Sequence, residues 1–231
     1  MKILAVDTSG SMCAAAVVDS AAGLLSSTVV NLDALKSTHS VHLMTIIDFT
    51  LKQAGCEVVD AFAVVVGPGS FTGLRVGIAT INGLCYATGK PAVAVSSLEA
   101  LAWNFPFAAY PVCPIIDARQ GEVYGALFKW SNGGFKTIVG HGLFGINDLL
   151  SLREFNEDRV IFTGCGVTAH KYSITTALGA MALFPETVHI SPYTVGTIGL
   201  NMATRGEFSQ SLSPVYLKMP LAVERLRSAN G

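Results

Sequence analysis

The sequence predicts an α/β protein made of two related units, because the same order of elements occurs twice. Residues 2–31 contain three short apolar runs in succession, which predict an antiparallel meander rather than parallel strands joined by crossovers. A second meander begins near residue 112. In both halves helical patterns and continuous apolar runs follow, and such runs are typical of strands buried on both faces. The pattern indicates a duplicated β-β-β-α-β-α unit, although no repeat of individual residues is visible.

The first unit, residues 1–105, starts with the meander and ends in a short helix. We expect strands at 2–6, 12–20, 24–31, 61–66 and 91–97. We expect helices at 41–54 with Ser40 as N-cap and Gly55 as stop, at 72–88 ended by Gly89, and at 97–103 capped by Ser96 or Ser97.

The second unit, residues 106–231, is smaller, and we expect its C-terminal tail to pack back on the first. The predicted strands are 112–117, 122–129, a third after the hairpin turn at 131–134, 159–163 and 187–192. Two helices are predicted, at 147–155 and at 194–206, the latter capped by Thr194 and ended by Gly206.

The composition favours apolar surface that is hidden against another protein. Hydrophobic residues make up 51% of the 231, charged residues only 13%, and the mean hydropathy is +0.50. A membrane span needs about 20 consecutive apolar residues, but the best candidates, 58–74 and 76–89, are separated by Arg75 and interrupted by Pro68 and glycines. The start turns polar at Asp7, so no secretory signal is indicated. We therefore expect a cytoplasmic protein with no membrane contact.

Charge and cysteine patterns argue against direct nucleic-acid binding and against metal. The formal net charge is −1 and no basic tract occurs; the tail cations Lys218, Arg225 and Arg227 accompany an acidic residue and are interpreted as a solvated end. Five scattered cysteines without a CxxC pair predict reduced thiols that fill the core. His39 and His42 have a spacing that metal sites use, but no third ligand is evident.

Two short polar segments are candidates for a nucleotide or phosphate site. In the turn "DTS", Asp7, Thr8 and Ser9 could hold a phosphate, or could simply form a turn. In "GPGSFTG" the residues Gly67, Gly69 and Ser70 precede a helix, which suits an anion. No GK[ST] follows, and the glycine spacing is not that of a dinucleotide fingerprint. A tight turn that needs positive φ explains the loop equally well.

Two helices have unusual compositions. Gly73, Gly77 and Gly83 each cost about 1 kcal/mol relative to alanine inside a helix, and close approach by another helix is the obvious compensation. The polar stripe of helix 41–54 is narrow, which indicates that the helix is covered on more than one side. Arg75 could neutralise an anion or cap a carbonyl. For "DARQGEVY" the default expectation is a structural pair between Asp117 and Arg119, and no Ser–His–Asp or Cys–His constellation is evident.

Four motifs occur in an order that resembles one family. "ILAVDTS", "GPGSFTGLRVGIAT", "DARQGEVY" and "SPVYLK" are similar to segments of the bacterial TsaB (YeaZ) family, strongly over residues 1–130 and more loosely beyond. The resemblance implies an actin/Hsp70/sugar-kinase-like fold, in which two related lobes, each with a mixed sheet flanked by helices, face a cleft. It also implies a role in making N6-threonylcarbamoyladenosine at position 37 of tRNA.

The resemblance further implies a non-catalytic scaffold. In the family pathway a catalytic paralogue, TsaD, uses a metal held by a His-x-x-x-His pair, and an ATPase subunit, TsaE, is also needed. At the corresponding place, residues 96–103, this chain reads "SSLEALAW", which offers no imidazole. The implied partners are therefore TsaD, TsaE in a ternary complex, tRNA only indirectly, and a second copy of the chain when TsaD is absent.

The resemblance implies that the paralogues bind each other through helices of their first lobes. A nucleotide is a candidate ligand at that interface. The expected interface residues are Leu43, Met44, Ile47, Leu51, Gly73, Leu74, Gly77, Ile78 and Ile81. ATP or ADP could bind at the partner interface. Its candidate contacts are Arg75, Arg119 and the two polar segments, and no other cofactor is expected. One alternative is an ATP-dependent kinase or ATPase of the same fold, with "FTGCGVT" at 162–168 as second phosphate loop, and another is a glycopeptidase.

Overall fold

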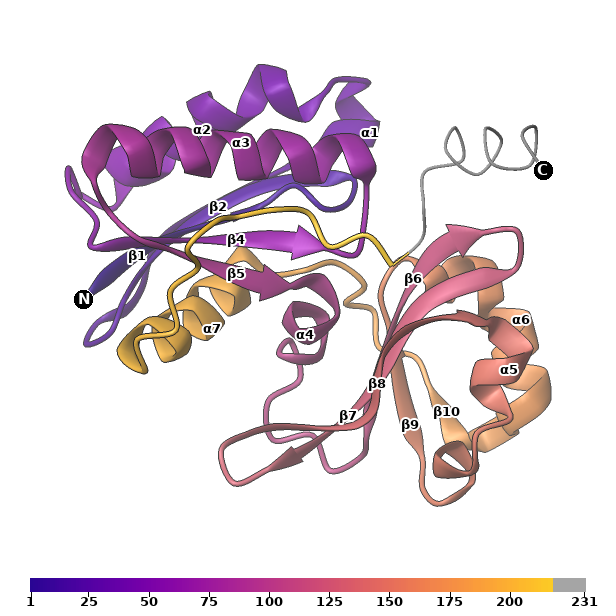
Figure 1. Cartoon of the computed structure of the whole chain (residues 1–231). Coiled ribbons are helices and arrows are strands. Elements are labelled where there is room, and N and C mark those ends of the chain that lie inside the picture. The colour runs from indigo at the N-terminus through magenta and orange to yellow at the C-terminus, as the bar shows by residue number, and fades with distance from the viewer. Residues whose placement is uncertain (218–231) are drawn as a thin grey trace, which may run out of the picture.

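The computed structural model describes residues 1–217, which form two lobes with one five-stranded sheet each (Figure 1). The first sheet has the spatial order β3 (Gly23–Asn31), β2 (Met12–Asp19), β1 (Lys2–Asp7), β4 (Ala61–Gly67), β5 (Ala92–Ser96). The second has the order β10 (Ala182–Leu183), β9 (Val160–Thr163), β6 (Val112–Arg119), β7 (Glu122–Ser131), β8 (Gly134–Gly145). In both sheets an antiparallel meander continues into two parallel strands, so the predicted duplication is confirmed by topology.

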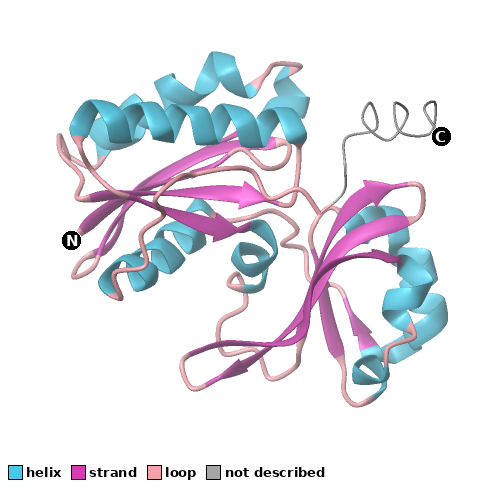
Figure 2. Cartoon of the chain, in the orientation of Figure 1, coloured by secondary structure: helices cyan, strands magenta, loops and turns pink. Residues whose placement is uncertain are grey.

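Helices cover both faces of the first sheet (Figures 1 and 2). On one face α2 (His39–Gln53) and α3 (Phe71–Thr88) lie side by side, and α7 (Pro192–Thr204) packs on the other. The short α1 (Leu32–Leu35) follows β3, and α4 (Ser97–Ala102) packs between the two sheets. The central strands β1 and β4 are buried on both faces, as their continuous apolar runs predict.

The second lobe departs from prediction in its helices. Only α5 (Ile146–Leu150) and a 3-10 turn at Arg153–Asn156 form where one helix was expected over 147–155. The Ser151 hydroxyl donates to the carbonyl of Asp148 at 2.7 Å, and Leu152 takes extended backbone with ψ of 137°, so the helix ends between them. We did not predict α6 (Gly166–Leu178), although its buried residues Val167, His170, Ile174 and Leu178 recur at helical spacing.

The strand predicted at 187–192 is wrong, because side chains satisfy this backbone. The Thr163 hydroxyl donates to the carbonyl of Thr187 at 2.8 Å. The Asn104 amide donates to the carbonyl of His189 at 2.8 Å and accepts from the Ser191 amide at 3.3 Å. The segment is a connection between lobes that leads into α7.

Most helix ends were placed within two residues. Ser70 caps α3 and Ser96 caps α4, and Gly89 ends α3 with φ of 68°. α2 begins at His39, after Thr38 rather than Ser40, and α7 begins at Pro192, after Ser191 rather than Thr194. Proline at the first helical position explains the earlier start of α7, because its fixed φ suits the first turn.

The chain returns to the first lobe after β10. α7 packs on β1, β2, β4 and β5, and the amide of Ser209 then donates to the carbonyl of Ala92 at 2.9 Å. The amide of Val215 donates to the carbonyl of Val66 at 2.8 Å. Residues 192–217 thus pack on the first sheet although they follow the second in sequence. Lys218, Arg225 and Arg227 lie outside the described residues. Within residues 1–217 no helix is long and apolar enough to cross a membrane.

Candidate functional site

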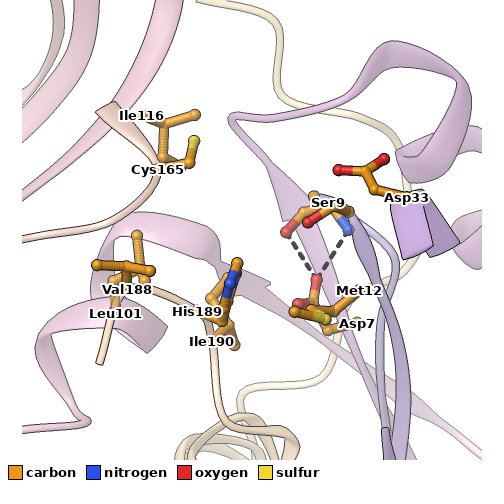
Figure 3. Close-up of a pocket in the computed structure, with 12 residues that line it drawn as sticks. Asp7, Ser9, Met12, Asp33, Leu101, Ile116, Cys165, Val188, His189 and Ile190 are labelled. Carbon is orange, nitrogen blue, oxygen red and sulfur yellow. Dashed lines mark hydrogen bonds between the residues drawn. The ribbon is translucent and has the colours of Figure 1, made fainter. Parts of the chain in front are cut away.

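A cleft of about 280 Å³ lies between the lobes, at the end of β1 (Figure 3). The first lobe contributes the turn after β1 and the start of α1, and the second contributes β6, the start of α6 and the connection to α7. Its lining consists of Asp7, Ser9, Gly10, Ser11, Met12, Asp33, Leu101, Ile116, Cys165, Val188, His189 and Ile190.

Asp7 is the most deeply placed charged group of this cleft. Its side chain is 3% exposed, and its Oδ1 accepts hydrogen bonds from the amide and the hydroxyl of Ser9 at 2.8 and 2.7 Å (Figure 3). Burial raises the pKa of the Asp7 carboxyl above its ordinary value; the bonds from Ser9 and the charges of His39 and His189 oppose the rise in part. The turn therefore holds a carboxyl group whose charged form is disfavoured.

The lining is acidic, which disfavours a bare polyphosphate. Asp7 and Asp33 are its carboxylates and His189 is its basic side chain, while none of the described lining residues is a lysine or arginine. A phosphate chain that entered without a cation would meet the Asp33 carboxylate and no lysine or arginine among these lining residues.

The residues predicted to hold a phosphate do not converge on this cleft. Asp7 and Ser9 line it, but Thr8, Gly67, Gly69 and Ser70, together with Arg75 and Arg119, are absent from its lining. The two polar segments instead pack on each other: the Ser70 amide donates to the carbonyl of Ser9 at 2.7 Å, and a Cβ on Gly69 would collide with that same carbonyl.

The glycine loop is used to direct α3. Ser70 Oγ accepts from the Gly73 amide at 3.3 Å and so caps the helix, and Ser97 Oγ donates to the carbonyl of Pro68 at 2.5 Å. Gly67 has φ of 123°, and a Cβ there would lie 2.8 Å from the carbonyl oxygen of Val215. Because these polar groups already have partners inside the chain, the loop fits a tight strand-to-helix turn better than a phosphate cradle.

The inner face of α3 explains two of its three glycines. Thr8 Oγ1 donates to the carbonyl of Gly73 at 2.8 Å. A Cβ on Gly73 would collide with the carbonyl of Thr8, and one on Gly77 with the Thr8 hydroxyl. We expected these glycines to admit a partner helix; that expectation is wrong, because what they admit is the "DTS" turn of the same chain.

Most of the predicted interface side chains are core residues. Within the lobe, the exposed fractions are at most 5% for Leu43, Ile47, Leu74, Ile78 and Ile81. Leu51 is half-buried against the same core. These side chains face the sheet and hold α2 and α3 on it. Their predicted place at an interface is therefore wrong, and they belong to the core. Of the expected set only Met44, 53% exposed, points to solvent.

The outer face of α3 carries a second set of small residues. Ala79, Gly83 and Ala87 are exposed and recur every four residues, and a Cβ on Gly83 would meet nothing within 4 Å. We call these three residues the outer stripe. Tyr86 beside it is 95% exposed. On the neighbouring α2 the large apolar side chains of Val41, Met44 and Phe49 are more than half exposed, at 65, 53 and 52%.

An aromatic and arginine cluster stands at the N-terminal end of this face. The Arg75 guanidinium lies 3.7 Å from the centre of the Phe71 ring, and its Nε donates to the Tyr216 hydroxyl at 3.0 Å. The rings of Phe71 and Tyr216 stack with centres 5.0 Å apart. No local sequence pattern indicates this cluster, because Tyr216 lies 141 positions from Arg75.

Arg119 lies on the β6–β7 hairpin with left-handed backbone. Its φ is 65°, and Gln120 and Gly121 follow with φ of 56° and 80°. The expected side-chain pair with Asp117 does not form; Asp117 Oδ1 accepts from the Arg119 backbone amide at 3.0 Å and lies 3.7 Å from His170 Nε2. A non-glycine residue with positive φ is uncommon, and such strain gathers at functional positions.

The cysteine of the cleft is a poor nucleophile. Cys165, exposed at the start of α6 rather than part of the core, is the exception to the predicted core thiols. Partial loss of water around the thiol in the cleft raises its pKa, and the charge of Asp117 adds to the rise, while backbone hydrogen bonds from Asp117, Cys165 and Gly166 oppose it in part. Residues 1–217 contain no group of three or more His, Cys, Asp or Glu side chains that could hold a metal.

Comparison with sequences of known proteins finds one family along most of the chain. Residues 33–207 match the family model described as "TsaD: tRNA N6-adenosine threonylcarbamoyltransferase". A Bacillus subtilis (strain 168) protein described as "tRNA threonylcarbamoyladenosine biosynthesis protein TsaB" is 30% identical over 223 residues, which cover 95% of each chain.

Comparison with solved structures gives the fold. A Pseudomonas aeruginosa protein described as similar to peptidase YeaZ has 25% identity and a TM-score of 0.80 over 94% of this chain and 99% of that one. The ROK hexokinase from Thermus thermophilus has 15% identity and a TM-score of 0.50 over 88% of this chain and 100% of the hexokinase. The fold is therefore the predicted actin/Hsp70/sugar-kinase-like one.

Proposed function

This chain belongs to the TsaB (YeaZ) family of tRNA threonylcarbamoyladenosine biosynthesis proteins, and we propose that it acts there as a non-catalytic subunit that binds and activates a TsaD-type transferase. The proposal places its function in a surface rather than in a catalytic centre. The surface is the outer face of α3 together with the exposed side chains of α2.

The outer stripe is the observation that carries this proposal. Ala79, Gly83 and Ala87 leave a shallow track along α3, and a helix laid in it would approach the α3 backbone closely. Val41 and Met44 offer exposed apolar area on α2, the helix that packs beside α3. Burial of such area yields roughly 25 cal/mol per Å².

The place of the transferase's metal pair supports a non-catalytic role. Ser96 to Trp103 follows β5 in this chain, and two of its serines have structural partners: Ser96 caps α4 and Ser97 binds the carbonyl of Pro68. These residues hold α4 against the glycine loop. The acidic cleft and the raised thiol pKa of Cys165 likewise give no support to a kinase or to a cysteine-dependent peptidase.

The proposal includes further partners. In the absence of the transferase, two copies of this chain would cover the outer stripes of each other and form a homodimer. A TsaE-type ATPase would join the heterodimer in the cytoplasm, with tRNA held by the transferase. A nucleotide at the junction remains part of the proposal, with Arg119 as its candidate contact.

Reconstitution of the tRNA modification tests the proposal. TsaD-type transferase, TsaE-type ATPase, threonylcarbamoyl-AMP and unmodified tRNA are incubated with and without this chain, and threonylcarbamoyladenosine is quantified by mass spectrometry. We expect product only when the chain is present, and no product from the chain without the transferase. Equal yields with and without the chain would overturn the proposal.

A further inference from the structure

We infer that Arg75, held in place by the C-terminal tail, receives a carboxylate of the protein that covers the outer stripe. The inference rests on the proposed function and adds a chemical requirement to it: the partner carries an aspartate or glutamate opposite the first turn of α3. The assignment comes from the way Arg75 is held, from the lack of a countercharge for it within residues 1–217 and from its place on the helix.

The tail segment 207–217 acts as a strap that positions Tyr216. Leu212 is buried in the first lobe, its carbonyl accepts from the Asn82 amide at 3.3 Å, and the Val215 amide bonds to the carbonyl of Val66 at 2.8 Å. These contacts anchor the strap to α3 and to the sheet on the N-terminal side of Tyr216. The hydroxyl of Tyr216 is thereby placed beside α3.

Tyr216 and Phe71 both contact the guanidinium of Arg75. One nitrogen, Nε, is bound by the Tyr216 hydroxyl at 3.0 Å, and the Phe71 ring lies 3.7 Å beneath the guanidinium carbon. Arginine normally loses much side-chain freedom when it forms an ion pair. Here part of that ordering exists before any partner arrives, which favours binding.

Among the described residues 1–217, Arg75 finds no countercharge. Within residues 1–217 no carboxylate lies within 4 Å of it, and its two terminal nitrogens make no hydrogen bond. Two parallel N–H donors remain available, and that arrangement matches a carboxylate.

The position of Arg75 on α3 means that a partner bound to the outer stripe would bury an unpaired guanidinium. Arg75 precedes Ala79 and Gly83 by four and eight residues, so it continues the outer stripe by one turn of the helix. A partner that covers the stripe would also cover the guanidinium. A cation that loses water without gaining an anion is strongly unfavourable, and a partner carboxylate removes that cost.

Titration of the TsaD-type transferase into variants of this chain tests the inference. We expect Arg75→Gln to weaken binding about 10- to 100-fold and to flatten its salt dependence, because a charged hydrogen-bonded pair is lost. Tyr216→Phe should keep the ring stack and weaken binding roughly 2- to 10-fold. Arg153→Gln is the matched control: it removes an arginine of the second lobe and should leave affinity unchanged. Thermal unfolding of each variant confirms that it is folded.

Three results separate this inference from its alternatives. Wild-type affinity and salt dependence for Arg75→Gln would overturn it; if Gly83→Leu still abolished binding, the proposed function would stand without it. A loss that occurs only when ATP or ADP is added would assign Arg75 to a phosphate and overturn the carboxylate. A charge-reversal experiment provides the result that supports the inference. Arg75→Glu should lose binding, and changing one Asp or Glu of the transferase to Lys should restore it.

Discussion

Glycines occur on both the inner and the outer face of α3, and they do opposite things there. On the inner face Gly73 and Gly77 touch Thr8, and no additional atom fits between helix and turn. On the outer face Gly83 meets nothing within 4 Å. One helix therefore uses glycine both to complete its own lobe and, in our proposal, to leave room for another protein.

The difference shows that the number of glycines in a helix does not reveal which face of the helix is approached. Three glycines at a cost of about 1 kcal/mol each indicate that something approaches the helix closely. They do not say from which side or from which molecule. Gly73 and Gly77 differ from Gly83 in role because the "DTS" turn lies against the first two and not against the third.

The largest expected effect is on the inner face. Gly73→Ala should lower the free energy of unfolding by about 3 kcal/mol or more, because the new Cβ collides with the backbone carbonyl of Thr8. Gly83→Ala in the same helix is the matched control and should raise the free energy of unfolding by up to about 1 kcal/mol. Urea denaturation measures both. Equal effects of the two substitutions would remove the distinction between the faces.

A smaller effect is expected where the turn meets the helix. Thr8→Val keeps the shape of the side chain but leaves the buried carbonyl of Gly73 without its hydrogen bond, so the free energy of unfolding should fall by about 1–3 kcal/mol. Thr45→Val on the exposed side of α2 serves as control and should change it by less than about 0.5 kcal/mol. If the two variants were equally stable, the contact between Thr8 and Gly73 would contribute nothing to folding.

The smallest effect is a pH dependence in the same turn. Because burial raises the pKa of Asp7 above 3.8, its neutral form contributes stability that is complete below about pH 3.8 and is lost as pH rises through the folded-state pKa. Asp7→Asn keeps a neutral acceptor for Ser9. We expect the variant to melt above the wild type at neutral pH and the gap to close on acidification. A gap that widened on acidification would show that the pKa of Asp7 is lowered rather than raised.

The sequence predicted the sheets well because their signals are local. The buried strands β1 and β4 are continuous apolar runs, and Ser70, Ser96 and Gly89 mark helix ends by their own side-chain or backbone chemistry. The connection at 187–192 was mistaken for a strand because apolar content alone does not reveal that Asn104 and Thr163 bind its backbone.

The candidate site was predicted less well, because it depends on distant contacts. Leu43, Leu74 and Ile81 were expected at an interface, since an apolar helix looks the same whether its own sheet or a partner covers it. The cluster around Arg75 was missed because Tyr216 joins it through the folded tail. Residue types identified α2 and α3, and only the fold distinguished their faces.

The affinity of Gly83→Leu for the TsaD-type transferase is the most direct test of the central claim that the outer stripe binds a partner. Isothermal titration calorimetry compares it with the wild type and with Gly140→Leu, whose glycine in the second lobe is equally free of contacts. We predict that Gly83→Leu folds normally but binds at least about 100-fold more weakly, because the leucine fills the track that a helix would occupy, while Gly140→Leu binds as the wild type. Wild-type affinity of folded Gly83→Leu would contradict the account.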